Sequence, residues 1–435
     1  MRVSRYGIAS LLIPGNSICT TTFAADFYIS EVGTPGSLGS GGVINPTNTY
    51  TADAAWTNPA GMTGLDDDAI LAGLTIATGE IKFDSDIGPA GDDDGNGLNT
   101  ALIPSFFYVR KLSEDARFGF SVAAPLGGGF DSGDDFVGRY VVTKTSLEGV
   151  GFTPSFAYRV NERLSVGAGL SVVYTRFEQD IALNQPGFED GKIKMEDLED
   201  WGTQGILSLT YELSSRSLLG LVYRSEADTE LSGDIKVENV QGEFSARRDL
   251  DVDWKNPQWL ELGLRLQLTD DTTLLFNLGW QEWSAFSDNR LEIDTTDNTV
   301  VNLDRKFNNI WHAGIAIWQA LENDAHMTLG LAYESSPVDD EDRTFDLPFD
   351  EVYKLAASYS WRGDEQFDYS VASTVYFYGD AAIDQTQQGV RTRGRVRYQC
   401  RRIFGCHDEL QILINALSRP VNCFSNQLYQ PVKGV

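Results

Sequence analysis

Residues that carry most enzyme and metal chemistry are scarce in this chain. It contains three histidines and four cysteines: His312, His326, His407, Cys19, Cys400, Cys406 and Cys423. No G-x-S-x-G, H-E-x-x-H or paired Cys/His spacing of the zinc type occurs. We therefore predict that the chain is not an enzyme, and we expect no catalytic residue, no cofactor and no metal site.

One acidic stretch has the spacing of half a calcium loop. Asp92, Asp94, Asn96 and Gly97 match the pattern D-x-[DN]-x-[DN]-G, but the twelfth position is Ile103, where a calcium loop needs a bidentate glutamate. An acidic external loop, able to meet divalent ions at a lipopolysaccharide surface, explains this stretch better than a specific calcium site.

Apolar and polar residues alternate along most of the chain, as in β-strands with two different faces. From Trp259 to Leu268 the sequence is WLELGLRLQL, with leucines on one face and Glu261 and Arg265 on the other. His312 likewise falls opposite Trp311, which predicts a polar lining residue on the inner side. A tilted strand of roughly 9 to 11 residues crosses a hydrocarbon layer.

We predict an all-β fold, a transmembrane antiparallel β-barrel in the outer membrane of a Gram-negative bacterium. A transmembrane helix is excluded because no apolar run of about 18 residues follows the N-terminus. Thirteen candidate strands lie near residues 69–78, 101–110, 117–126, 149–160, 163–176, 201–213, 218–237, 258–268, 272–286, 310–318, 326–334, 352–361 and 367–378. Single-chain barrels use even numbers, so one strand is missing.

Both ends of the chain differ from the body. Residues 1–24 have the features of a signal peptide, with Arg2 and Arg5, an apolar stretch and a small-residue cleavage site before Ala25. The barrel is expected over 63–390. Up to Val390 there are 26 Lys+Arg and 61 Asp+Glu, a balance that argues against nucleic acid as a partner.

From Arg391 onward the counts are 8 Lys+Arg and 2 Asp+Glu. Residues 391–435 are therefore interpreted as an anomalous basic tail. Shifting the frame from Val396 permits an alternating strand that ends in an aromatic residue, so our hypothesis is that a frameshift replaced the closing strand.

The body resembles a known family in the order and spacing of several motifs. These are Phe27, Ser37–Gly42, Asp53–Met62 containing Asn58-Pro59-Ala60, Phe152–Arg159, Leu164–Leu170, Leu221–Glu226, Trp280–Phe286 and Tyr378–Ala381. Over about residues 25–390 the chain resembles the FadL/TodX (OMPP1) family of outer-membrane transporters for long-chain fatty acids and aromatic hydrocarbons.

The resemblance implies a 14-stranded barrel, of which this chain lacks the last strand as written, with residues 25–62 folded inward as an N-terminal hatch. It assigns gating to Asn58, Pro59 and Ala60 and an N-terminal ligand contact to Phe27. It also places a lateral opening at a kinked third strand, where Pro125, Gly127, Gly128 and Gly129 lie. Pro and Gly suit a bulge or an opening; a strand that ends in a glycine loop is the alternative.

The expected function is passive, hatch-gated uptake of hydrophobic compounds, either fatty acids or aromatic hydrocarbons. The other expected partners are outer-membrane lipid, lipopolysaccharide and the barrel assembly machinery, and the expected state is a monomer. A general porin or structural barrel is the alternative, and a membrane-embedded hydrolase lacks a catalytic constellation.

Two expectations concern side chains along the route. A fatty-acid carboxylate would need a buried cation, for which Arg159, Arg176 and Arg224 are candidates by type. The tryptophans are mostly expected in interface girdles at strand ends, with one or two open to ligand stacking. They are Trp254, Trp259, Trp280, Trp283, Trp311, Trp318 and Trp361.

Overall fold

The computed structural model describes residues 31, 33–92, 101–241, 244–294, 299–363, 367–399 and 409–418. Phe27, the signal peptide, the four cysteines and most of the acidic D-x-[DN]-x-[DN]-G stretch lie outside these residues.

Within the described residues, fourteen antiparallel strands pair with their neighbours in one circuit that returns to β1. In order around the wall they are β1 (Ala69–Thr78), β3 (Ala101–Lys111), β4 (Ala116–Asp131), β5 (Lys144–Arg159), β6 (Leu164–Leu183), β7 (Gly191–Ser214), β8 (Ser217–Arg224), β11 (Trp259–Gln267), β12 (Thr272–Gln281), β15 (Ile310–Ala320), β16 (His326–Glu334), β17 (Val352–Arg362), β18 (Asp368–Tyr378) and β21 (Glu409–Ser418). The predicted barrel fold is confirmed.

The period-two pattern sets the inner and outer faces as predicted. On β11, Leu260 and Leu262 are each 40% exposed, whereas Glu261 between them is 4% exposed. On β15, Trp311 is exposed and His312 is buried in the lumen. Apolar side chains therefore face outward, toward lipid, and polar side chains face inward.

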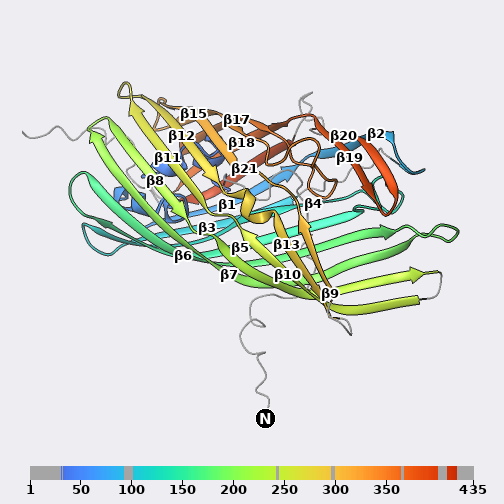
Figure 1. Cartoon of the computed structure of the whole chain (residues 1–435). Coiled ribbons are helices and arrows are strands. Elements are labelled where there is room, and N and C mark those ends of the chain that lie inside the picture. Colours follow the sequence, from blue (N-terminus) through green and yellow to red (C-terminus); the bar gives the residue numbers. More distant parts are fainter. Residues whose placement is uncertain are drawn as a thin grey trace, which may run out of the picture.

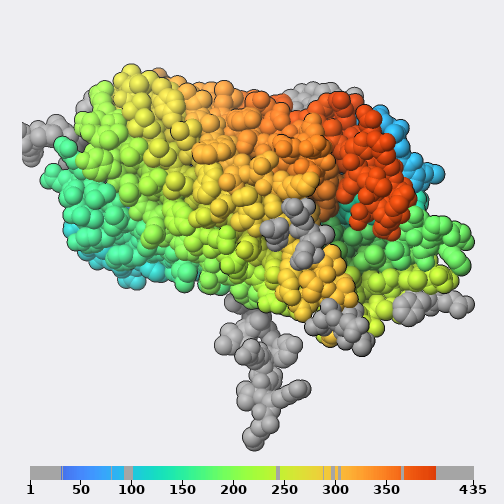
Figure 2. All heavy atoms as spheres, viewed as in Figure 1, coloured from blue at the N-terminus to red at the C-terminus, as the bar shows by residue number. Residues whose placement is uncertain are grey.

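The connections between strands differ in length at the two ends of the barrel. Short turns close one end, while the other carries strand extensions and β2 (Glu80–Ile87), β9 (Ala227–Val240), β10 (Phe244–Asn256), β13 (Asp288–Ile293), β14 (Thr299–Asp304), β19 (Ala381–Gln387) and β20 (Val390–Gln399). β19, β20 and β2 form a separate three-stranded sheet, seen in red and blue at the right of Figures 1 and 2. Short turns are typical of the periplasmic end and long loops of the cell surface.

The strands β2, β10, β13, β14, β19 and β20 were not predicted, and two strand assignments of the wall differ from the sequence prediction. The single strand expected over 218–237 is two strands, β8 and β9, because the chain leaves the wall after Arg224. The barrel was also expected to end at residue 390 with its last strand lost. Instead the backbone of β21 pairs with β18 on one side and β1 on the other. Its sequence, ELQILINALS, carries a strand pattern although no strand was predicted there; the frameshift stays a hypothesis about the gene.

Candidate functional site

The segment that precedes β1 folds inside the barrel and is called the hatch here (residues 33–65). It contains α1 (Pro35–Ser40), η2 (Asn45–Thr47), α2 (Ala54–Thr57) and η3 (Pro59–Gly64), and its blue helical turns lie inside the strand wall (Figure 1). Thr34 caps α1 through Ser37 N–H, and Gly41 ends it at φ 63°. No helix of the described residues is long and apolar enough to cross a membrane.

A buried carboxylate holds the hatch together. Asp53 accepts hydrogen bonds from Thr34 Oγ1 at 2.5 Å, Asn48 Nδ2 at 2.8 Å and Thr51 Oγ1 at 2.5 Å. Because three donors share one charged acceptor, the hatch has an internal polar centre that fixes its turns relative to one another.

The predicted gating residues lie where the hatch meets the wall. Asn58 is fully buried, and its Nδ2 donates to Pro46 O at 2.5 Å and to Leu209 O of β7 at 3.4 Å. Ala60 N–H donates to Ser208 Oγ at 2.9 Å. The Asn-Pro-Ala turn therefore joins two parts of the hatch to each other and to β7.

Glycines on the inner face allow this close approach. A Cβ at Gly220 of β8 would lie 1.7 Å from Pro46 O, and one at Gly167 of β6 would lie 2.3 Å from Ala60 N. Any larger residue would push the hatch backbone off the wall.

Four wall arginines donate to backbone carbonyls of the hatch. Their acceptors are Leu65 O at 2.7 Å for Arg117, Thr63 O for Arg159, Trp56 O for Arg224 and Thr47 O at 3.4 Å for Arg265. Arg224 also lies 3.8 Å from the Trp56 ring centroid and 5.2 Å from that of Trp259. Charge-assisted hydrogen bonds therefore hold the hatch to the wall at four points along its length.

A buried ionic network lies farther around the wall, on β12 to β17. Lys354 Nζ is 2.9 Å from Glu31 Oε1 and 2.7 Å from Glu334 Oε1. His312 Nδ1 is 3.1 Å from Glu334 Oε1, and its Nε2 is 3.0 Å from Asn277 Oδ1. The network joins β12, β15, β16 and β17 to the chain just before the hatch, so it ties that segment to the wall.

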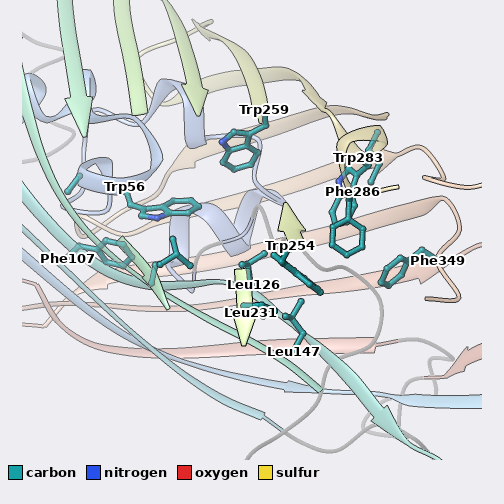
Figure 3. Close-up of a cluster of buried hydrophobic side chains, with 14 of the residues drawn as sticks. Trp56, Phe107, Leu126, Leu147, Leu231, Trp254, Trp259, Trp283, Phe286 and Phe349 are labelled. Carbon is teal, nitrogen blue, oxygen red and sulfur yellow. The ribbon is translucent and has the colours of Figure 1, made fainter. Parts of the chain in front are cut away.

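Apolar side chains fill the lumen between the hatch and the long end of the barrel. One continuous cluster includes Trp56 of the hatch, Trp259 of β11, Trp254 of β10, Leu126 of β4 and Leu147 of β5. Figure 3 shows these residues converging from the hatch, several strands and the loops toward one interior region. The lumen therefore contains an apolar track.

The burial of the tryptophans corrects the prediction for them. Trp311 and Trp361 are exposed on the outer wall, as girdle residues would be, but Trp254, Trp259, Trp283 and Trp318 are each buried to 5% exposure or less. Position near a strand end does not separate the two groups. Trp259 and Trp318 face inward by the period-two pattern of β11 and β15, whereas Trp254 and Trp283 lie in β10 and in the loop after β12.

A partly open pocket lies at the long end of this track. Its apolar lining residues are Phe177, Met195, Val252, Trp254, Phe286, Leu291 and Leu347. The polar lining residues are Thr145, Gln179, Asn289, Arg305 and Asp346. A mostly apolar concave site with a few polar groups is typical of small-molecule binding.

The two charged residues of the pocket neutralise each other. Arg305 Nη1 is 2.6 Å from Asp346 Oδ2 in the loops above the wall. Burial alone would raise the pKa of Asp346, but the charge of Arg305 and hydrogen bonds with Thr344 and Arg305 hold that pKa below its usual value. Asp346 is thus ionised at neutral pH.

The wall is irregular where a lateral opening was expected. The β4–β5 pairing shifts register between Ala123 and Leu126, so Pro125 lies in a β-bulge. In the described residues the β3–β4 ladder ends at the pair Phe106–Val122, and the two strands diverge beyond it.

The glycines that follow continue the strand. Gly127, Gly128 and Gly129 pair with β5, and β4 runs on to Asp131. The alternative interpretation, a strand that ends in a glycine loop, is therefore wrong. A Cβ at Gly127 would meet nothing within 4 Å, so space is open beside this part of the wall.

The three arginines considered for a ligand carboxylate have other partners. Arg159 and Arg224 hold hatch carbonyls. Arg176 lies 2.6 Å from Glu178 and 2.9 Å from Asp197, with 35% of its side chain exposed. Sequence alone identified Arg224 by type, but it missed Arg305 and Lys354, whose acidic partners are distant in the chain.

Comparison with known proteins decides the family. Residues 15–402 match the family described as outer membrane protein transport protein (OMPP1/FadL/TodX). The chain belongs to this family. A FadL/TodX family member is an outer-membrane transporter, so the predicted location is confirmed.

Curated relatives agree over most of their length. The chain is 21% identical to the long-chain fatty acid transport protein of Escherichia coli K12, over 84% of this chain and 90% of that protein. It is 22% identical to outer membrane protein P1 of Haemophilus influenzae KW20/Rd, over 80% and 85%.

Solved structures of the FadL/TodX family share the fold. A Pseudomonas aeruginosa FadL homologue aligns with a TM-score of 0.79 at 18% identity, covering 92% of this chain and 99% of that one. The Pseudomonas putida toluene transporter TodX aligns with a TM-score of 0.66 at 17% identity, covering 91% and 99%.

Proposed function

We propose that the chain carries hydrophobic small molecules, of the class of fatty acids or aromatic hydrocarbons, passively across the outer membrane. Family members are named for long-chain fatty acids and for toluene. The observation that carries the proposal is the apolar track from the pocket to the hatch, inside a barrel whose strands otherwise turn polar residues inward.

The driving force is burial of apolar ligand surface, worth roughly 25 cal/mol per Å² removed from water. A ligand binds first among Phe177, Trp254 and Phe286, at the end that faces the cell surface. It then passes along the track toward Trp56 and the β4 bulge. A steady water-filled pore would not solvate such a molecule.

The gating roles extend the family resemblance to this chain. Asn58, Pro59 and Ala60 control the hatch through their bonds to Pro46, Leu209 and Ser208. Phe27, which lies outside the described residues, contributes an N-terminal ligand contact.

The exit is lateral. The bulge at Pro125 and the open space beside Gly127, in the strand segment that continues through Gly128 and Gly129, let ligand leave between β3 and β4 into the surrounding layer. The exposed apolar wall contacts outer-membrane lipid and lipopolysaccharide, the assembly machinery inserts the barrel, and the unit is a monomer. The chain acts as a transporter without enzyme activity.

The porin alternative gains no support from the lumen. Four arginines and a buried ionic network hold the hatch across it. A general porin would need an aqueous channel there.

Uptake of labelled toluene and oleate by cells that lack other transporters of this family tests the proposal. Cells with the wild-type chain should take up at least one of them faster than vector cells. Leu291→Trp, which fills the pocket, should slow that uptake, and Leu291→Ala, which enlarges it, should not. Equal uptake in wild-type, Leu291→Trp and vector cells would contradict the proposal.

A further inference from the structure

We infer that Asp346 determines specificity: by neutralising Arg305 it makes the pocket accept uncharged, ring-containing hydrocarbons and reject their carboxylates. This inference rests on the proposed function, because it names the ligand class of the same pocket.

The pocket lining carries one cation and one anion, which pair with each other. Arg305 and Asp346 are the charged residues of the pocket, and their side chains are 16% and 12% exposed. In their 2.6 Å contact, Asp346 occupies the place beside the Arg305 guanidinium that a ligand carboxylate would otherwise take. Arg305 Nε also donates to Asn289 Oδ1 at 3.3 Å. A ligand carboxylate would have to displace Asp346 or lie beside it, and like charges repel.

The apolar lining of the pocket is mainly aromatic at one side. Phe177 and Trp254 lie 5.5 Å apart between ring centroids, and Trp254 and Phe286 lie 4.8 Å apart in an edge-to-face arrangement. Such rings present both edges and faces, which suit offset or edge contacts with another aromatic ring.

Two further cations, Lys354 and Arg224, lie in the lumen near the hatch. Lys354 already contacts two carboxylates, those of Glu31 and Glu334. Arg224 lies over the Trp56 ring and donates to the Trp56 carbonyl. The charge of Lys354 is therefore already paired, so a carboxylate that reaches it would have to displace Glu31 or Glu334, whereas the contacts of Arg224 are with a ring and a carbonyl.

Toluene and benzoate form a matched probe pair, because they share the ring and differ in a methyl or a carboxylate. Binding to purified, detergent-folded protein at neutral pH can be followed by calorimetry. The wild type should bind toluene at least about tenfold more tightly than benzoate. Asp346→Asn keeps the side-chain shape and an acceptor oxygen, and it should narrow this ratio mainly by strengthening benzoate binding.

Two further variants make the test specific. The double variant Arg305→Met with Asp346→Asn removes both charges and should restore the preference for toluene. Asp342→Asn alters the neighbouring surface pair, where Lys306 Nζ lies 2.7 Å from Asp342 Oδ1, and should leave the ratio unchanged. Heat-dependent gel mobility verifies that each barrel is folded.

Two results would overturn this inference but leave the proposed function standing. One is that the wild type binds benzoate as tightly as toluene. The other is that the ratio of toluene affinity to benzoate affinity is the same in the wild type and in a folded Asp346→Asn variant. If Asp346→Asn does not fold, the wild-type ratio and the double variant still decide the inference. Absence of binding for toluene, benzoate and oleate alike would overturn the proposed function together with it.

Discussion

Gly220→Ala is expected to displace the hatch while leaving the barrel folded. The added Cβ would lie 1.7 Å from Pro46 O and 3.2 Å from Thr47 N, whereas ordinary contacts begin at 3.4 Å. The Pro46 carbonyl must therefore retreat by about 1.7 Å. That carbonyl accepts the 2.5 Å hydrogen bond from Asn58, so the Asn-Pro-Ala turn loses its contact with η2.

The cost follows from these two effects. Overpacking of this kind costs about 1–3 kcal/mol, and a buried group that loses its partner costs about 1–3 kcal/mol more. A total of at least about 2 kcal/mol would increase the open population of the hatch by roughly thirtyfold. The strand ladders of β8 are untouched, so the barrel should keep its resistance to heat.

Hydrogen exchange of residues 45–60 in the detergent-folded protein measures this opening directly. Gly205→Ala is the matched control, because its Cβ would meet Ser225 Oγ at an ordinary 3.6 Å. Gly220→Ala should lose protection across the hatch and show higher ionic conductance in planar bilayers. Hatch protection equal to that of Gly205→Ala would refute the reasoning.

Two more substitutions test the ties between hatch, wall and exit. Lys354→Met removes the cation shared by the buried Glu31 and Glu334. It should therefore lower the free energy of unfolding, measured by urea titration, by about 3–5 kcal/mol. A decrease below about 1 kcal/mol would contradict this expectation. Gly149→Ala would place a Cβ 2.5 Å from that of Leu126 beside the bulge, so toluene uptake should fall while the barrel folds; unchanged uptake would mean that the bulge is not part of the route.

The barrel could be predicted because a membrane imposes one rule on every strand. Each spanning strand must be apolar on its outer face, and the lumen admits polar groups, so alternation appears in the sequence itself. Leu260, Glu261 and His312 therefore took the predicted faces. The thirteen expected strand regions all contain strands of the structure.

The missed strands lie mainly beyond the membrane, where this rule no longer applies. In β10, Trp254 turns inward to the pocket, and in η4 (Trp283–Phe286) after β12, Trp283 is buried in the apolar cluster. Neither position is marked by a distinct pattern, because extensions and loops at the cell surface have no lipid-facing side.

The charged contacts of the lumen could not be predicted for a different reason. Lys354 and Glu31 are separated by 323 positions, and Arg305 and Asp346 by 41. Their meeting depends on how the strands register around the ring and on where the loops fold back. The sequence indicates that such residues exist, but it does not identify their partners.

The most direct test is a crystal structure of the protein soaked with 4-bromotoluene, located by the anomalous signal of bromine. The account predicts bromine density in the pocket among Phe177, Trp254 and Phe286. Bromine density confined to the outer, lipid-facing wall, with the pocket empty at saturating ligand, would contradict a transport route through the lumen.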